Sequence, residues 1–256
     1  MAEVVLTETL DDIGVVTMNR PEAHNAVDGA LCDGLRAAFD WIEQDETIRV
    51  GVLCAAGRSF CAGMDLKAFA AGEGDAILNG RDGFGGLVRR HRNKPLIAAV
   101  GGAALAGGFE LALACDMIVA SPGARFGLPE PKRGLIAGAG GTFRLAERVP
   151  AAKAAEILLT GRIFDRDEAE TLGLISRSTE TADPKPEALA LARDITACAP
   201  LPVSAILSLL HGMGQGDETA LWHESDRVFA PIAVSGDAHE GALAFAEKRA
   251  ARWQGC

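Results

Sequence analysis

The sequence predicts an α/β fold, on three observations. Short apolar runs such as VGVLCA at 50–55 and LIAAV at 96–100 alternate with segments of helical periodicity. From residue 151 onward, helical patterns dominate. The chain has 256 residues, of which 48% are hydrophobic and 23% charged, so it can bury one sizeable core. We therefore expect an α/β core that passes into a helical C-terminal part.

The N-terminal elements follow from local patterns. The β-like runs VVLTETL and IGVVTMN are separated by Asp11 and Asp12, which predicts a hairpin. Asp28 is the expected N-cap of a helix that continues to about Gln44, because apolar residues recur there at helical spacing. The strand VGVLCA then ends in the turn AAGRSFCAG. Residues 71–86 are polar and rich in glycine, which predicts a mobile loop.

The later elements alternate in the same way before helices take over. LIAAV and CDMIVA (115–120) are the next strands, with GGAALAGGFELALA between them. The predicted C-terminal helices are AAKAAEILLTG, DRDEAETLG, PEALALARDITAC, PVSAILSLLHGM and an amphipathic piece from about 237 to 253.

Charge and cysteine content exclude some classes of protein. The net charge is −10 and no basic run forms a phosphate-tracking stripe, which disfavours nucleic acid as a partner. The six cysteines are scattered without a C-x-x-C pair, and the N-terminus has no basic segment followed by an apolar one. We expect reduced thiols and a cytoplasmic location.

One stretch, LIAAVGGAALAGGFELALA at 96–114, is long and apolar enough to resemble a membrane span. Pro95, two Gly-Gly pairs and the buried charge of Glu110 oppose that interpretation, because a carboxylate inside lipid costs about 2.5 to 3.5 kcal/mol. A strand, a glycine turn and a buried helix fit better. We expect no membrane as a partner.

Common cofactor and metal motifs are absent. No phosphate-cradling G-x-x-x-x-G-K-[ST] occurs, and GAGGTF has Phe143 where a dinucleotide-binding loop needs glycine. In GRSFCAG, Cys61 stands where a serine-hydrolase elbow needs its second glycine. The five histidines show no metal-ligand spacing, so no metal is predicted.

Three segments point to chemistry beside a carbonyl group. GRSFCAGMDLKAF is a turn of small residues before a helix, where backbone N–H groups can face an anionic oxygen. AALAGGFELALACD carries Glu110 near a helix start, and FGLPEPKRGLIAGAGGTFRL carries Glu130 between two prolines. Two carboxyls in an apolar site can have raised pKa values, which suits acid–base catalysis. The residues alone name no reaction, since a helix-start carboxylate and an exposed turn acid explain both glutamates equally well.

The chain resembles the crotonase family, also called the enoyl-CoA hydratase/isomerase superfamily, over nearly its full length. Five blocks match in order, namely NRPEAHNA, FCAGMDLK, ALAGGFELALACD, FGLPEPKRGLIAGAGGTFRL and AFAEKR. The resemblance implies a spiral of ββα units over residues 1–195 and a helical trimerisation region over 196–256. It also implies a homo-oligomer, either a trimer or a dimer of trimers.

The resemblance assigns roles to particular residues. The backbone N–H groups of Met64 and Gly107 would form an oxyanion hole, and we expect glycine at 107 because a side chain would obstruct the thioester. Glu110 and Glu130 would hold a water and add it across the C2–C3 double bond of a trans-2-enoyl-CoA. Glu130 is the expected proton donor to C2, and Glu110 the expected activator of water.

Coenzyme A would be bound by residues from both ends of the chain: Ala23, His24, Ala62, Asp65, Leu66, Lys67, Phe245 and Lys248. In many family members the residues that match the last two come from a neighbouring subunit. Glu22 departs from the pattern, since the family often has lysine there. The acyl-CoA is the substrate, and no further cofactor is implied.

Two alternatives remain open at this stage. One is another reaction of the same family, either double-bond isomerisation or dehydration of a hydroxyacyl-CoA. The other is a non-catalytic or RNA-binding family member, which the acidic composition disfavours because phosphate neutralisation supplies most nucleic-acid affinity.

Overall fold

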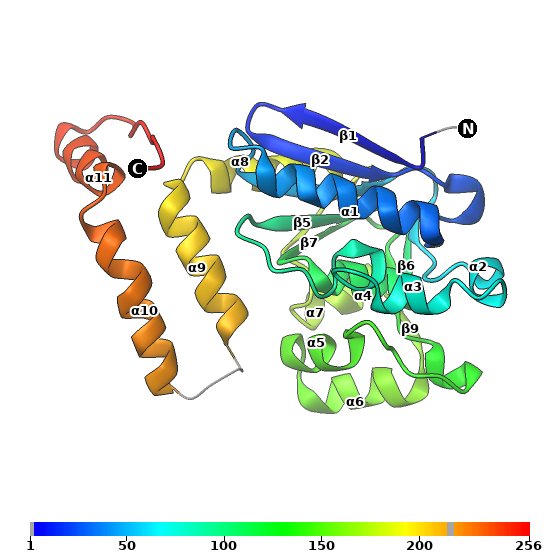
Figure 1. Cartoon of the computed structure of the whole chain (residues 1–256). Helices are drawn as coiled ribbons and strands as arrows, with labels where there is room; N and C mark the ends of the chain where they lie inside the picture. The colour runs from blue at the N-terminus through cyan, green and yellow to red at the C-terminus, as the bar shows by residue number, and fades with distance from the viewer. Residues whose placement is uncertain (1–2, 214–217) are drawn as a thin grey trace.

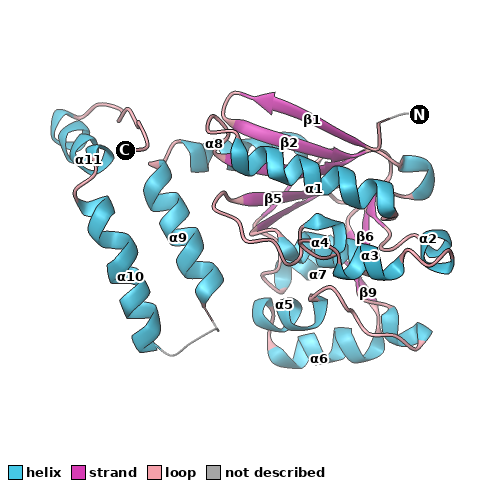
Figure 2. Cartoon of the chain, in the orientation of Figure 1, coloured by secondary structure: helices cyan, strands magenta, loops and turns pink. Residues whose placement is uncertain are grey.

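The computed structural model describes residues 3–213 and 218–256, and strands and helices alternate through its first two thirds (Figures 1 and 2). The larger sheet has six strands, and only the β1–β2 pair is antiparallel. Their order is β1 (Val5–Leu10), β2 (Ile13–Met18), β3 (Val50–Ala55), β5 (Leu96–Val100), β7 (Met117–Ala120) and β10 (Arg177–Ser178). The expected hairpin and the three expected strands β3, β5 and β7 are confirmed, and the structure shows that these three pair in parallel.

A second sheet of short strands runs beside the first. Its order is β4 (Ser59–Cys61), β6 (Ala103–Leu105), β8 (Arg125–Gly127) and β9 (Ile163–Asp165), with only β8 and β9 antiparallel. The chain passes from β3 to β4, from β5 to β6 and from β7 to β8, so successive strand pairs fill matching positions in both sheets. This repeated passage is the spiral that the resemblance implied.

The second sheet was not predicted from the sequence. AAGRSFCAG and GGAALAGG were expected to be turns, yet they contain β4 and β6. Each of these strands has only three residues, so neither is long enough to show the alternation that marks a strand. Pairing with neighbouring strands, rather than local propensity, orders them.

Helices cover both faces of the large sheet, which explains why its central strands β3 and β5 are apolar and buried. Helix α1 (Gly29–Gln44) packs on one face with Leu53, and α8 (Lys185–Thr196) packs on the other with Val52 and Cys54. The Asp28 side chain accepts the Leu31 N–H at 2.8 Å and so caps α1 as expected.

The remaining helices lie around these layers or form the C-terminal part. They are α2 (Leu66–Ala70), α3 (Gly74–Asn79), α4 (Gly107–Ala114), α5 (Gly141–Arg148), α6 (Ala151–Thr160), α7 (Arg166–Thr171), α9 (Pro200–Gly212), α10 (Glu218–Ala233) and α11 (Gly236–Glu247), with single 3₁₀ turns η1 (Pro21–Ala23), η2 (Phe84–Gly86) and η3 (Glu130–Arg133). Helices α9 and α10 lie side by side, to one side of the sheets (Figure 1).

Two local expectations need correction. The segment 71–86, expected to be a loop, contains α3 and η2, because Ile77 and Phe84 are buried and anchor it to the core. Helix α10 was not predicted, and Pro231 inside it is one reason, since proline normally ends a helix. The expected boundary at 195/196 falls at the end of α8, and the division into two domains stays a prediction.

Helix α9 is attached to the core through a buried charge cluster. Asp116 accepts hydrogen bonds from both terminal nitrogens of Arg92, at 2.6 and 2.8 Å, and from the Leu96 N–H at 2.7 Å. The Nε2 atom of His211, on α9, lies 2.8 Å from Asp116 Oδ1, the oxygen that the Leu96 N–H does not contact. Burial raises the pKa of Asp116, but the bonds from Arg92 and His211 outweigh it and hold that pKa well below its usual value. One carboxylate thus joins the start of β5 to α9.

Candidate active site

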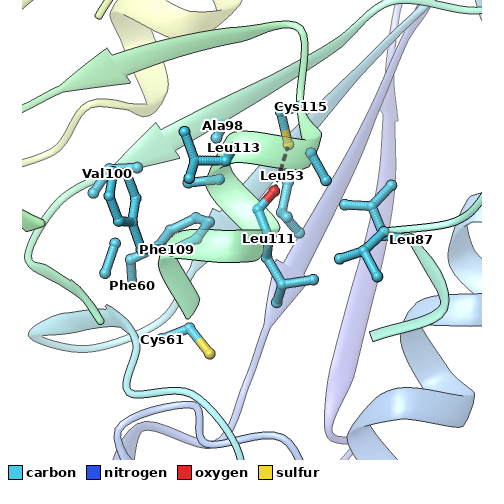
Figure 3. Packing of buried hydrophobic residues seen from close by; sticks show 14 of the residues in the cluster. Leu53, Phe60, Cys61, Leu87, Ala98, Val100, Phe109, Leu111, Leu113 and Cys115 are labelled. Carbon is cyan, nitrogen blue, oxygen red and sulfur yellow. Dashed lines mark hydrogen bonds between the residues drawn. The ribbon is translucent and has the colours of Figure 1, made fainter. Parts of the chain in front are cut away.

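The apolar stretch 96–114 is divided among three elements. It forms β5, the short β6 and helix α4, and every residue of α4 is buried. Figure 3 shows Phe109, Leu111 and Leu113 extending from α4 into the core, with Cys61 beside the start of the helix. No single described helix is long and apolar enough to cross a membrane, although α8 and α9, bent by 110°, pass that test as a pair.

Glu110 is the one charged residue of α4, and it is only 3% exposed. Its Oε1 accepts the backbone N–H groups of Ala139 at 2.7 Å, from the turn before α5, and of Gly141 at 2.8 Å, the first residue of α5. Burial raises the pKa of Glu110 to about 7, although these two N–H groups oppose the shift. A carboxyl with this pKa can take up and release protons near neutral pH.

Glu130 opens η3, directly after Pro129, and is half-buried. Its Oε2 is buried and has no hydrogen-bond partner among the described residues. Burial raises the pKa of Glu130, and its negative charge raises the pKa of Glu110 further. The two carboxyls therefore lie within electrostatic range of each other, and one of them has an acceptor atom free for water or substrate.

The segment that carries the Met64 N–H passes the start of α4, where the Gly107 N–H lies. A Cβ built on Gly63 would stand 3.1 Å from the Gly107 nitrogen, so residues 63–64 run directly past the start of α4. Val27 fixes that segment, because it donates to the Gly63 carbonyl and accepts from the Asp65 N–H. Neither the Met64 nor the Gly107 N–H donates to a described residue. Two such donors suit an oxygen that carries negative charge.

Packing dictates the glycines at the start of α4. A Cβ on Gly107 would stand 2.6 Å from the Phe84 ring, and one on Gly108 would stand 2.0 Å from the Cys61 carbonyl oxygen. The expected reason for glycine at 107, clearance for a thioester, is therefore incomplete, since the protein's own ring already fills the space. Ala106, which precedes them, has a φ of 50°, a conformation costly for a residue with a Cβ.

The N-terminal residues expected to bind coenzyme A lie together on two adjoining turns. His24 ends η1 in a left-handed conformation, and its carbonyl accepts the Ala62 N–H at 3.1 Å. Asp65 caps α2 by accepting the N–H groups of Lys67 and Ala68. Ala23, close to His24, belongs to η1 itself. Leu66 and Lys67 are exposed at the start of α2, and Leu66 is 66% exposed.

Phe245 and Lys248 lie far from these turns in the single chain. Phe245 is on α11 and Lys248 is its C-cap, and α11 and α2 stand at opposite ends of the molecule in Figure 1. Phe245 is 88% exposed. One chain therefore does not bring these two residues to Ala62 and Lys67.

Several residues that shape the site escaped sequence reasoning. Ala139 and Gly141 bind Glu110 through backbone N–H groups, which no side-chain pattern reveals. Phe84 lies in a segment interpreted as a loop. The glycines of GAGGTF lack the dinucleotide-binding pattern, but their position before a helix is the signal for backbone donors to an anionic group. In the described ranges 3–213 and 218–256, no cluster of potential metal ligands occurs.

Comparison with known proteins identifies the class to which this fold and site belong. The Enoyl-CoA hydratase/isomerase family model matches residues 8–256, and the chain belongs to that family. Carnitinyl-CoA dehydratase of Proteus mirabilis is 38% identical, with 100% of both chains covered. Enoyl-CoA hydratase EchA19 of Mycobacterium tuberculosis is 39% identical, with 94% of this chain and 92% of the relative covered.

A solved structure agrees with this placement. The crystal structure of enoyl-CoA hydratase from Mycobacterium tuberculosis H37Rv matches with a TM-score of 0.95 and 46% identity, covering 99% of this chain and 100% of that one. The fold is thus that of the enoyl-CoA hydratases. Relatives of the hydratase and dehydratase type indicate a lyase that acts on CoA thioesters.

Proposed function

We propose that this protein is an enoyl-CoA hydratase, which adds water in the syn sense across the C2–C3 double bond of a trans-2-enoyl-CoA. The observation that carries the proposal is the pair of carboxyls with raised pKa values, Glu110 and Glu130, beside two unused backbone N–H groups. Hydration needs both a base and an acid, whereas isomerisation can be served by one group that moves a single proton.

The steps follow from the positions of these groups. The thioester oxygen accepts the N–H groups of Met64 and Gly107, which stabilise the enolate by about 3 kcal/mol for each donor. Ionised Glu110 removes a proton from water as its oxygen attacks C3. Protonated Glu130 then donates a proton to C2. The two carboxyls titrate as a coupled pair, so the roles describe the pair in its singly protonated state.

Substrate binding is assigned to the two adjoining turns. Coenzyme A lies along Ala62 to Lys67 and beside Ala23 and His24, with the Lys67 ammonium near its phosphates. Phe245 and Lys248 reach the coenzyme of a neighbouring subunit. Their distance from the coenzyme-binding turns of the same chain supports this assignment. The assembly is a trimer or a dimer of trimers. The reaction uses no cofactor beyond the coenzyme of its substrate.

A second candidate is dehydration of a hydroxyacyl-CoA, favoured by the similarity to a carnitinyl-CoA dehydratase. It uses the same two carboxyls in reverse. The balance between the two directions depends on the acyl group. Comparing crotonyl-CoA with 3-hydroxyacyl-CoA thioesters, including one with a trimethylammonium group, identifies the preferred substrate.

The deciding experiment is loss of the enoyl-thioester absorbance with crotonyl-CoA and with longer, branched and aromatic enoyl-CoAs. We expect turnover of at least one of these substrates. Absence of turnover across the panel, together with activity on a 3-enoyl-CoA, would identify an isomerase instead. Filter binding of RNA at two salt concentrations tests the non-catalytic alternative. Tight, salt-sensitive retention without thioester turnover would reject the enzyme.

A further inference from the structure

Arg144, on α5, binds two backbone carbonyls from separate segments of the chain. Its NH1 donates to the Ala139 carbonyl at 3.1 Å, and its NH2 donates to the Val88 carbonyl at 2.5 Å. The guanidinium also lies 5.1 Å from the centre of the Phe143 ring. A Cβ on Gly140 would stand 2.2 Å from NH1, so glycine at 140 makes room for this arrangement.

Ion pairing does not explain the position of Arg144. None of the ion pairs among the described residues includes Arg144, and it is half-buried. Burial and the neighbouring charges of Arg148 and Arg92 lower the pKa of Arg144, while Glu110 and Glu147 raise it. A cation kept beside other cations is costly unless its hydrogen bonds compensate. The hydrogen bonds to the Ala139 and Val88 carbonyls therefore hold Arg144 in this position.

The two carbonyl partners of Arg144 come from different parts of the candidate site, one next to Glu110 and one next to the Gly107 N–H. Ala139 is one of the two residues whose N–H groups hold Glu110. Val88 follows η2, whose Phe84 ring packs against Gly107, and the Val88 N–H donates to the Phe84 carbonyl at 3.4 Å. The Arg144 guanidinium thus joins the turn that holds the acid to the segment that backs the oxyanion donor.

We propose that Arg144 is a positioning residue, which fixes Glu110 relative to the Gly107 N–H by holding the Ala139 and Val88 carbonyls with one rigid guanidinium. The proposal rests on the proposed hydration for its kinetic consequence. A lysine has one ammonium on a flexible stem and does not reproduce a planar two-carbonyl fork. Misplacing a catalytic group by about 1 Å costs on the order of 100-fold in rate.

Electrostatics gives an independent readout. The charged groups that act on Glu110 are Glu130, which raises its pKa, and Arg144, which lowers it. Loss of Arg144 therefore raises the Glu110 pKa. The Arg144→Lys variant keeps the positive charge. A rise in the Glu110 pKa in that variant therefore reports a weakened hydrogen bond from the Ala139 N–H to Glu110.

The test compares Arg144→Met and Arg144→Lys with Arg148→Met in the full-length protein. Arg148 is a matched control, because it lies one turn later on α5, is half-buried and donates to the Cys115 carbonyl, away from Glu110. We expect both Arg144 variants to lower kcat for crotonyl-CoA at least tenfold, with KM within twofold. Arg148→Met should keep kcat within twofold. Thermal unfolding confirms that each variant is folded.

A second measurement separates this inference from the proposed reaction. Titration of the ¹³C-labelled Glu110 carboxyl by NMR needs no turnover, so it decides the role of Arg144 even if the wild-type protein hydrates nothing. We expect the midpoint to rise in both Arg144 variants and to stay unchanged in Arg148→Met. The proposal would be overturned if Arg144→Lys kept the wild-type kcat and the wild-type Glu110 midpoint. It would also be overturned if Arg148→Met changed both quantities as much as the Arg144 variants do.

Discussion

The ring of Phe84 fills the space that a side chain on residue 107 would need, with its Cζ 2.6 Å from a Cβ built on Gly107. Phe84 is fully buried, so the ring has little room to move. Glycine at 107 is therefore imposed by the wall behind the helix start. The position of the Gly107 N–H depends on a segment far from it in sequence.

Gly107→Ala should push the start of α4 away from Phe84 and displace the N–H. Loss of one oxyanion donor costs about 100-fold to 1,000-fold in kcat, so we expect at least a 100-fold loss of hydration. Combining Phe84→Leu with Gly107→Ala provides space for the new methyl group. The double variant should have a kcat at least tenfold higher than that of Gly107→Ala alone. Phe84→Leu alone is the control for the smaller ring. Full activity in Gly107→Ala would refute the packing argument.

Glu130→Gln removes the proposed acid and keeps the side-chain shape. We expect hydration to fall at least about 100-fold, the lower range for general acid–base groups, while CoA affinity stays unchanged. Glu147→Gln, on the exposed face of α5, is the control for loss of one negative charge. Unchanged turnover in Glu130→Gln would sink the two-carboxyl mechanism.

Glu110→Gln should stabilise the protein at alkaline pH. The pKa of Glu110 is raised from 4.5 to about 7 in the folded state. Between those values the folded state holds a proton that the unfolded state has released, so the free energy of unfolding falls as pH rises. At 1.36 kcal/mol per pKa unit, the loss above pH 7 is at most about 3 kcal/mol. Neutral glutamine avoids this loss.

Urea unfolding at pH 4 and pH 8 measures the effect at matched protein concentration. The two proteins should differ little at pH 4, and the variant should be more stable at pH 8. The same pKa predicts that kcat/KM falls as pH drops below about 7, because Glu110 must be ionised to activate water. Equal pH dependence of stability in both proteins would contradict the raised pKa.

Asp116→Asn should destabilise the fold, because it breaks the buried pair with Arg92 and weakens the contact with His211. Removing one partner of a buried ion pair costs about 3–5 kcal/mol. Asp194→Asn is the surface control, since Asp194 pairs with Arg177 but is 65% exposed, and it should cost about 1 kcal/mol or less. A similar cost in both variants, measured by urea unfolding, would argue against the buried cluster.

Local patterns predicted the elements that have clear periodicity. The capped helix after Asp28 follows from apolar residues at helical spacing, and the central strands of the large sheet follow from short continuous apolar runs. The second sheet does not follow from sequence, since strands of three residues are ordered by pairing with their neighbours. The resemblance to a known family supplied the spiral arrangement.

The candidate site divides in the same way. Glu110 stood out because a lone carboxyl in an apolar stretch needs an explanation, and Glu130 because two prolines flank it. The contacts of Ala139, Phe84 and Arg144 come from segments distant in sequence and involve backbone groups or packing. No residue pattern within one segment encodes them.

The most direct test of the account is the fate of solvent atoms during turnover of crotonyl-CoA. The reaction is run in H₂¹⁸O and, separately, in D₂O, and the product is analysed by mass spectrometry and NMR. Hydration by Glu110 and Glu130 predicts a 3-hydroxyacyl-CoA with one ¹⁸O at C3, and one deuterium at C2 on the face that syn addition requires. A product that has deuterium but no ¹⁸O, with the double bond moved, would contradict the account.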